Sequence, residues 1–106
     1  MSDPEAVGSP EVLKSYSHDA SAAAHLLAAH DFTAEAEQAY RSATAICPWN
    51  PESVNGLADL LSRSGRADEA ERVVNDFEQK YPEQRAILER FRAASRVIMA
   101  AQPVKP

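Results

Sequence analysis

The sequence predicts an all-α fold in which two helical hairpins are followed by a single capping helix. Three observations predict it: a segment recurs after 34 residues, a proline ends each copy, and apolar residues recur at helical spacing. A chain of 106 residues forms one small domain at most. We expect repeats at 17–50 and 51–84 and a capping helix at 84–100, between a flexible linker at 1–9 and a tail at 101–106.

The repeat is visible when the sequence is shifted by 34 residues. "HLLAAHDFTAEAEQAYRSATAICP" (25–48) then lies over "DLLSRSGRADEAERVVNDFEQKYP" (59–82). Most of the coinciding residues are small, apolar or helix-breaking, and these are the residue types that a helical hairpin must fix. The coinciding pairs are Ala24 and Ala58, Leu26 and Leu60, Leu27 and Leu61, Glu35 and Glu69, Ala36 and Ala70, Glu37 and Glu71, and Pro48 and Pro82.

Two prolines and an asparagine separate the repeats, in the joint "ICPWNPES" at 46–53. Pro48 prevents the preceding helix from continuing, because proline lacks an amide hydrogen and clashes with the preceding turn. Asn50 is a good N-cap, and Pro51 suits the first position of the next helix. The joint is therefore expected to end one helix and start another.

Each repeat is expected to consist of two helices, each with one apolar face. In the second repeat they span about 51–63 and 67–80, and Gly65 between them can take the left-handed conformation that closes a helix. The first repeat follows the same scheme around the turn "HDFT", and its first helix starts early, after Ser9 and Pro10. The residues expected to face the core are Val12, Leu13, Tyr16, Ala20, Ala23, Ala24, Leu27, Ala36, Ala39, Tyr40, Ala43, Val54, Leu57, Ala58, Leu61, Ala70, Val73, Val74 and Phe77, and in the capping helix Ile87, Leu88, Phe91, Ala94 and Ile98.

This pattern resembles the tetratricopeptide repeat, whose 34-residue motif is W-x2-L-G-x2-Y, then A-x3-F, then P. The corresponding positions are Val54, Leu57, Ala58, Leu61, Ala70, Val74 and Pro82 in the second repeat and Ala20, Ala23, Ala24, Leu27, Ala36, Tyr40 and Pro48 in the first. The chain departs from the motif because no tryptophan opens either repeat and Asp31 takes the place of the turn glycine. The resemblance, over about 17–84, implies a short α-solenoid with a right-handed superhelical twist.

The resemblance also implies a binding surface, since the first helices of such repeats line a concave groove. The residues at the groove positions are His18, Ser21, His25, Ala28, Ala29, Glu52, Asn55, Asp59, Ser62 and Arg63, with Arg90 and Arg96 added by the last helix. We expect a protein or peptide segment to bind there. The nine residues expected to contact it are His18, Ser21, His25, Glu52, Asn55, Asp59, Ser62, Arg63 and Arg90. One subclass of the family grips a carboxylate of chaperones, but of the five positions of that clamp only Arg90 carries a matching residue, so this ligand is not expected.

Catalytic and metal sites are not expected. Cys47 is predicted at the C-terminal end of a helix, where the helix dipole raises the pKa of a thiol. His18, His25 and His30 lack the i,i+3 or i,i+4 spacing with which two helical histidines bind one metal ion. The three glycines form no phosphate-binding loop. We therefore expect no enzymatic activity and no cofactor.

The composition narrows the class of partner. The 16 acidic and 11 basic side chains give a formal charge of −5, which would repel the phosphates of a nucleic acid. The chain has no signal-like start and no apolar run of about 18 residues, so we expect no membrane insertion and favour a soluble, cytoplasmic protein.

The leading hypothesis for function is a non-catalytic protein-interaction scaffold. Both ends of the chain carry prolines and little pattern, as linkers do, so we expect it to be part of a larger protein. Two alternatives stay open. The chain is a homo-oligomerisation module that associates through its C-terminal helix, or it positions an unseen catalytic or membrane domain.

Overall fold

The computed structural model describes the backbone of residues 9–101 and the side chains of residues 9–95. In this part of the chain the elements are α2 (Pro10–Ala29), α3 (Thr33–Ile46), α4 (Pro51–Arg63), α5 (Ala67–Lys80), the 3-10 turn η1 (Pro82–Gln84) and α6 (Arg85–Ala101). The described residues are thus all-α, as predicted. Apart from Ser9 and Ala101, the expected linker and tail lie outside the described residues.

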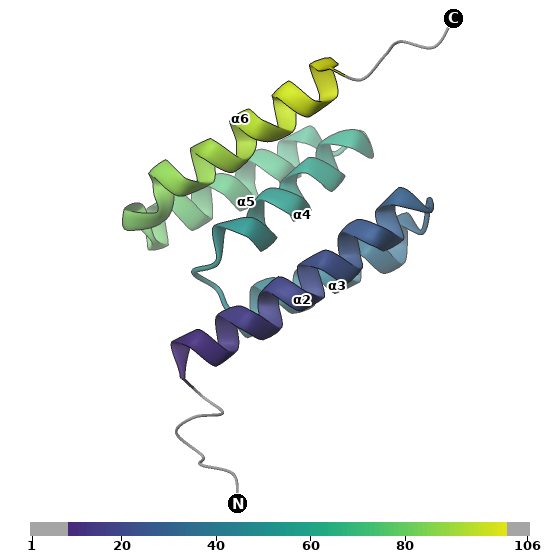
Figure 1. Ribbon diagram of the computed structural model, residues 1–106. Coiled ribbons are helices and arrows are strands. Elements are labelled where there is room, and N and C mark those ends of the chain that lie inside the picture. Colours follow the sequence, from purple (N-terminus) through teal and green to yellow (C-terminus); the bar gives the residue numbers. More distant parts are fainter. Residues whose placement is uncertain (1–8, 102–106) are drawn as a thin grey trace, which may run out of the picture.

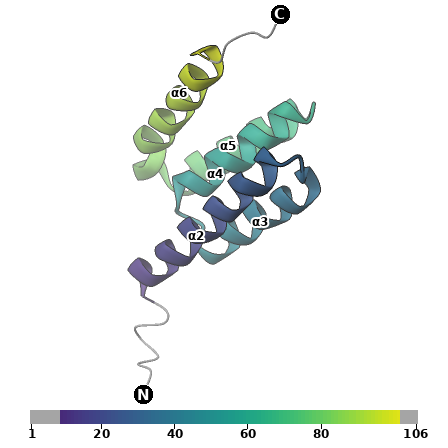
Figure 2. The ribbon, with the colours of Figure 1, turned by 45° about the vertical axis from the view of Figure 1, so that its right-hand side comes forward.

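The helices form two hairpins and a covering helix. Figure 1 shows α2 beside α3, α4 beside α5, and α6 next to the second hairpin, and Figure 2 shows the same order from another side. Helix α4 lies at the centre, because it contacts α2 and α3 of the first hairpin, its own partner α5, and α6. The surroundings of α4 therefore decide how the hairpins stack.

The ends of the helices follow the local sequence. The Ser9 hydroxyl caps α2 by accepting a hydrogen bond from the Val12 amide, and both first-position prolines are where they were predicted. Asp31 and Gly65, at equivalent positions of the two repeats, have φ angles of 67° and 79°. Aspartate enters this left-handed region more readily than most residues, so it can replace the turn glycine of the motif.

The core confirms the small-residue positions of the repeat. Ala24, Ala36, Ala58 and Ala70 are all buried, and they pack in one cluster with the larger apolar residues of α4 and α5. Small side chains at these places leave room for the neighbouring helices, so the register of the 34-residue repeat is correct.

The buried face of α2 differs from the predicted one. Ala24 is buried as predicted, but Tyr16 is 57% exposed and Ala23 is exposed, whereas Ser17 and Ser21 are buried. The prediction followed the apolar residues alone. Serine is small enough for close packing between helices. The hydrogen bonds of the Ser17 hydroxyl at the joint offset the cost of burying it, so the serine face turns inward.

Helix α6 is also turned relative to the prediction. Leu88 is fully buried as expected, but Ile87 is 42% exposed and Ala94 is exposed. Arg92 is half-buried, and its guanidinium lies 3.1 Å from the Glu71 carboxylate of α5. This ion pair favours the rotation of α6 towards α5. The side chains of Arg96, Val97, Ile98 and Met99 lie outside the described residues.

A buried polar network holds the joint between the repeats. The Asn50 side chain caps α4 by accepting from the Glu52 amide at 3.1 Å, and its Nδ2 donates to Ser17 Oγ at 3.0 Å. Ser17 Oγ in turn donates to the Ala43 carbonyl at 2.8 Å, and Ser53 Oγ donates to the Asn50 carbonyl. Residues from α2, α3 and α4 thus share one set of hydrogen bonds, and Asn50 is 2% exposed.

A second link between the repeats is ionic. Arg41 of α3 contacts Glu69 of α5 at 2.6 Å, and Arg66 contacts Glu37 at 2.6 Å. Hydrogen bonds from Arg66 and Arg41 lower the pKa of the Glu37 carboxyl. These side chains are between 21% and 45% exposed, so water still screens the pairs and each contributes little. The ionic network therefore supplements the buried joint.

Gly56 marks a close approach between the repeats. A Cβ atom at this position would lie 2.2 Å from Cε1 of Tyr40, whose ring packs from α3 against the backbone of α4. Such a distance is far below van der Waals contact, so a larger residue at Gly56 forces the ring or the helix to move.

We predict that Gly56→Ala lowers the free energy of unfolding by about 1–3 kcal/mol, because the added methyl group overpacks the contact. At an open helical position the same change would instead stabilise the helix by about 1 kcal/mol. Urea unfolding measures the difference. In a Tyr40→Leu background the loss should shrink or reverse, and a stabilised single variant would show that the two helices are not in tight contact here.

Candidate protein-binding groove

A groove with a volume of about 420 Å³ lies between α2, α4 and α6. It is lined by Ser21, Ala22 and His25 of α2, by Glu52, Asn55, Gly56, Asp59 and Arg63 of α4, by Phe91 and Ser95 of α6, and by Tyr40 of α3. Six of the nine residues predicted to bind a partner are in this lining, namely Ser21, His25, Glu52, Asn55, Asp59 and Arg63. Side chains more than 70 residues apart in the chain thus meet at one surface.

The other three predicted residues lie outside this lining. His18 lines a neighbouring depression together with Glu52, and Ser62 lines a second pocket on the other side of α4. Arg90 is exposed on α6 and belongs to none of these linings. The groove is therefore centred on the middle of α4.

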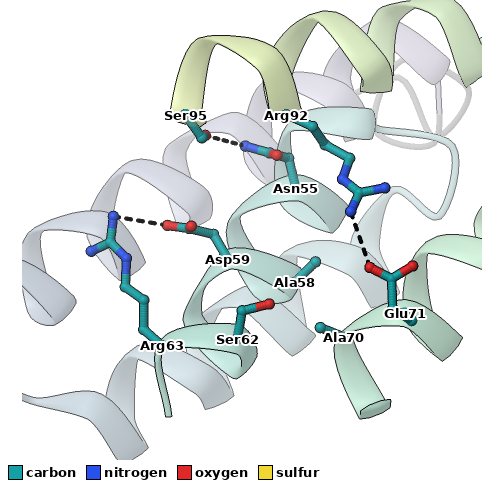
Figure 3. A pocket seen from close by; sticks show the side chains of 9 residues that line it. All are labelled: Asn55, Ala58, Asp59, Ser62, Arg63, Ala70, Glu71, Arg92 and Ser95. Atoms are coloured by element: carbon teal, nitrogen blue, oxygen red, sulfur yellow. Dashed lines mark hydrogen bonds and ion pairs between the residues drawn. The ribbon is translucent and has the colours of Figure 1, made fainter. Parts of the chain in front are cut away.

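The second pocket adjoins the groove. It has a volume of about 270 Å³ between α4, α5 and α6, and Figure 3 shows its lining. Asn55, Asp59, Arg63 and Ser95 line both pockets, so the two form one continuous concave surface.

Two contacts fix α6 at the edge of this surface. Asn55 Nδ2 donates to Ser95 Oγ at 3.3 Å, and Arg92 of α6 pairs with Glu71 of α5 (Figure 3). Asn55 was predicted as a ligand-binding residue, but its amide donor already holds α6 against α4. Its role in the structure is therefore to position the wall of the groove.

Arg63 and Asp59 form an ion pair along α4, with 3.0 Å between the guanidinium and the carboxylate (Figure 3). The Arg63 side chain is 53% exposed, so water screens this pair and its contribution to stability is small. Both groups can therefore exchange this contact for one with a ligand at little cost.

His18 and Glu52 connect α2 to α4 at the rim of the groove. The His18 Nδ1 and Glu52 Oε1 atoms are 2.8 Å apart. This hydrogen bond and the charge of the carboxylate raise the pKa of His18 above its usual value. Protonation of His18 therefore strengthens the contact between the two helices, and deprotonation at higher pH weakens it.

Tyr40 brings a phenol to the floor of the groove from α3. Burial raises the pKa of Tyr40, and the nearby Asp59 carboxylate raises it further. The phenol therefore stays protonated and keeps its ability to donate a hydrogen bond. Its ring covers Gly56 and fills the space that a side chain at this position would take.

Ser21 occupies an unusual position in the wall. It was predicted on the open surface of the groove, but it is only 4% exposed. Among the buried side-chain nitrogen and oxygen atoms of the described residues, only Ser21 Oγ has no hydrogen-bond partner. An unpaired buried hydroxyl is unfavourable, and this makes the surroundings of Ser21 a place to look for a ligand atom.

The structure also bears on the side chains that were considered for catalysis and metal binding. Cys47 is fully buried at the joint, and burial raises the pKa of its thiol, so the reactive thiolate is disfavoured. In the part of the chain that the structure describes, no cluster of three or more histidine, cysteine, aspartate or glutamate residues could hold a metal ion. None of the described helices is long and apolar enough to cross a membrane.

The sequence predicted that the last helix contributes to the groove through Arg90 and Arg96, but the groove is lined by Phe91 and Ser95 of α6. Phe91 and Ser95 follow Leu57 and Leu61 by one 34-residue period, and in α4 those two leucines belong to the core. In α6 the same positions are half-buried and form a wall of the groove. Phe91 was predicted to face the core, whereas Ser95 was not singled out, because a pattern of apolar residues does not identify a polar residue in a wall.

Comparison with known proteins agrees with the repeat pattern. The sequence model of the tetratricopeptide repeat family matches residues 26–95. Neither a curated protein nor a solved structure matches the chain. Tetratricopeptide repeats generally mediate protein–protein interaction and are typically non-catalytic. The family match covers the end of α2, all of α3, α4 and α5, and the first part of α6, which is more than half of the chain. The chain therefore belongs to the tetratricopeptide repeat family.

Proposed function

We propose that the chain is a non-catalytic protein-binding module that holds a peptide or protein segment in the groove between α2, α4 and α6. The observation that carries this proposal is the lining of the groove, which combines six predicted residues from two repeats with a wall from α6. Binding sites of this kind are concave and offer a few polar groups among apolar ones.

The chemistry of the lining suits a peptide. Arg63 and the Tyr40 phenol can donate hydrogen bonds, while the Glu52 and Asp59 carboxylates can accept them. A peptide backbone carries donors and acceptors in alternation, so it can pair with both kinds of group. Phe91 adds an apolar surface against which a side chain of the segment can pack.

The groove is also preformed. The buried joint at Asn50 fixes α4 against the first hairpin, and the Asn55–Ser95 hydrogen bond fixes α6 against α4. A rigid site loses little conformational entropy on binding, so more of the contact energy contributes to affinity.

The test compares variants of the groove with a variant of α5. We predict that His25→Ala and Arg63→Ala weaken binding of the partner by about 1–3 kcal/mol, as expected for the loss of a buried or charge-assisted hydrogen bond. Thermal stability should change little because both side chains are exposed. The partners are first captured on immobilised protein from a lysate of the source cells, and their affinities are then measured by calorimetry.

Asp76→Ala is the matched control, because Asp76 is exposed on α5 and lines neither pocket. Glu71 is unsuitable for this purpose, since it pairs with Arg92 at the edge of the second pocket. Partners that bind the groove variants as tightly as the native protein, or that are lost with Asp76→Ala, would refute the proposal.

A further inference from the structure

We propose that the ligand of the groove is a basic peptide segment, which places a lysine or arginine side chain between Glu52 and Asp59 and a backbone carbonyl at Ser21. This inference rests on the proposed function and specifies its ligand. Charge, aromatic surface and one unpaired hydroxyl support it independently.

The charge of the lining favours a cation. Two carboxylates, Glu52 and Asp59, face the groove together with one guanidinium, Arg63. Their formal charges leave the lining negative, and the whole chain carries −5. An acidic segment would meet repulsion from both, whereas a basic one is attracted at long range and at contact.

The present partners of the two carboxylates are easily replaced. Asp59 pairs with Arg63, whose side chain is 53% exposed, and Glu52 pairs with His18, whose side chain is 61% exposed. Contacts with such exposed groups contribute little to stability. A ligand cation can therefore bind between Glu52 and Asp59 without breaking a strong interaction.

Two aromatic rings line the same groove. Tyr40 lies on its floor and Phe91 on its α6 wall. Aromatic faces attract ammonium and guanidinium groups and also pack well against the methylene chains of lysine and arginine. Carboxylates beside aromatic rings are thus the surroundings that a long basic side chain prefers.

Ser21 supplies the specific contact with the backbone of the segment. Hydroxyl groups of helical residues often donate to the carbonyl four residues earlier, and Thr44 and Ser64 do so at 2.9 Å, to Tyr40 and Leu60. The Ser21 hydroxyl makes no such bond, although Ser21 is 4% exposed and lines the groove. The Ser21 oxygen is buried in its present rotamer, so binding would include a rotation of the side chain that turns the hydroxyl towards the groove, where a carbonyl oxygen of a bound segment would accept its hydrogen.

The inference is tested by nuclear magnetic resonance with the ¹⁵N-labelled chain and three pools of short, end-capped peptides. The pools are randomised except at a central residue, which is lysine or arginine in one, glutamine in the second and glutamate in the third. We expect the basic pool to shift the amide signals of Ser21, Asn55 and Gly56, with an affinity about tenfold higher than that of the other pools.

Three variants locate the contacts. Glu52→Gln and Asp59→Asn should each lower the affinity for the basic pool by about three- to tenfold, and Ser21→Ala should lower the affinity for all pools by a similar factor. Asp76→Asn removes an exposed carboxylate on α5, outside the groove, and should change nothing. An unchanged amide spectrum away from the substitution verifies that each variant is folded.

The outcomes separate this inference from the proposed function. If the glutamate or glutamine pool shifts the groove signals at least as strongly as the basic pool, the basic ligand is refuted while groove binding stands. If no pool shifts the groove signals, or if the shifts map to α5, both proposals fail. Equal binding by native protein and Ser21→Ala refutes the backbone contact at Ser21.

Discussion

The stacking of the two hairpins depends on the buried side chain of Asn50. Its oxygen caps α4, and its nitrogen reaches Ser17 of α2, whose hydroxyl is bound in turn to the last part of α3 through the Ala43 carbonyl. Leaving one of these buried groups without a partner would cost about 1–3 kcal/mol. Few other placements of α2 relative to α4 satisfy all of them, so the network selects one arrangement of the hairpins.

The concave surface follows from this arrangement. Once the start of α4 is fixed at Asn50, the residues one to three turns later are brought opposite α2, and the contact of Gly56 with Tyr40 sets how closely α3 approaches. Helix α6 then completes the surface through Asn55 and Ser95. Three contacts of α4 thus define the surface: the hydrogen bonds of Asn50, the contact of Gly56 with Tyr40 and the hydrogen bond from Asn55 to Ser95.

Much of the fold could be predicted from the sequence because its signals are local. The caps at Ser9 and Asn50 and the left-handed turn at Gly65 depend on residues close in the chain, and the 34-residue period reports the small core positions. The rotation of α2 and α6 could not be predicted in this way. It depends on polar contacts such as Ser17 with Asn50, which join residues far apart and which apolar patterns do not reveal.

The groove could be predicted only where its residues follow the period of the repeat. The period of the repeat identified the exposed face of α4, so Glu52, Asp59 and Arg63 are in the lining. The walls depend on tertiary contacts: Tyr40 enters from α3 because Gly56 leaves room for it, and Ser21 is enclosed between helices. Three-dimensional packing therefore decides which of the polar residues along a repeat can meet a ligand.

The central claim is that Asn50 acts as a buried link between the repeats as well as an N-cap. The most direct test is to compare the losses in free energy of unfolding for Asn50→Ala and Ser9→Ala by urea denaturation. Both residues cap a helix that begins with proline. The Ser9 side chain, however, accepts a hydrogen bond only from the Val12 amide of its own helix, α2. We predict a loss of about 0.5–1 kcal/mol for Ser9→Ala and about 2–4 kcal/mol for Asn50→Ala, since the latter also breaks the bond to Ser17. Equal losses would contradict the account, because they would mean that Asn50 contributes only as a cap.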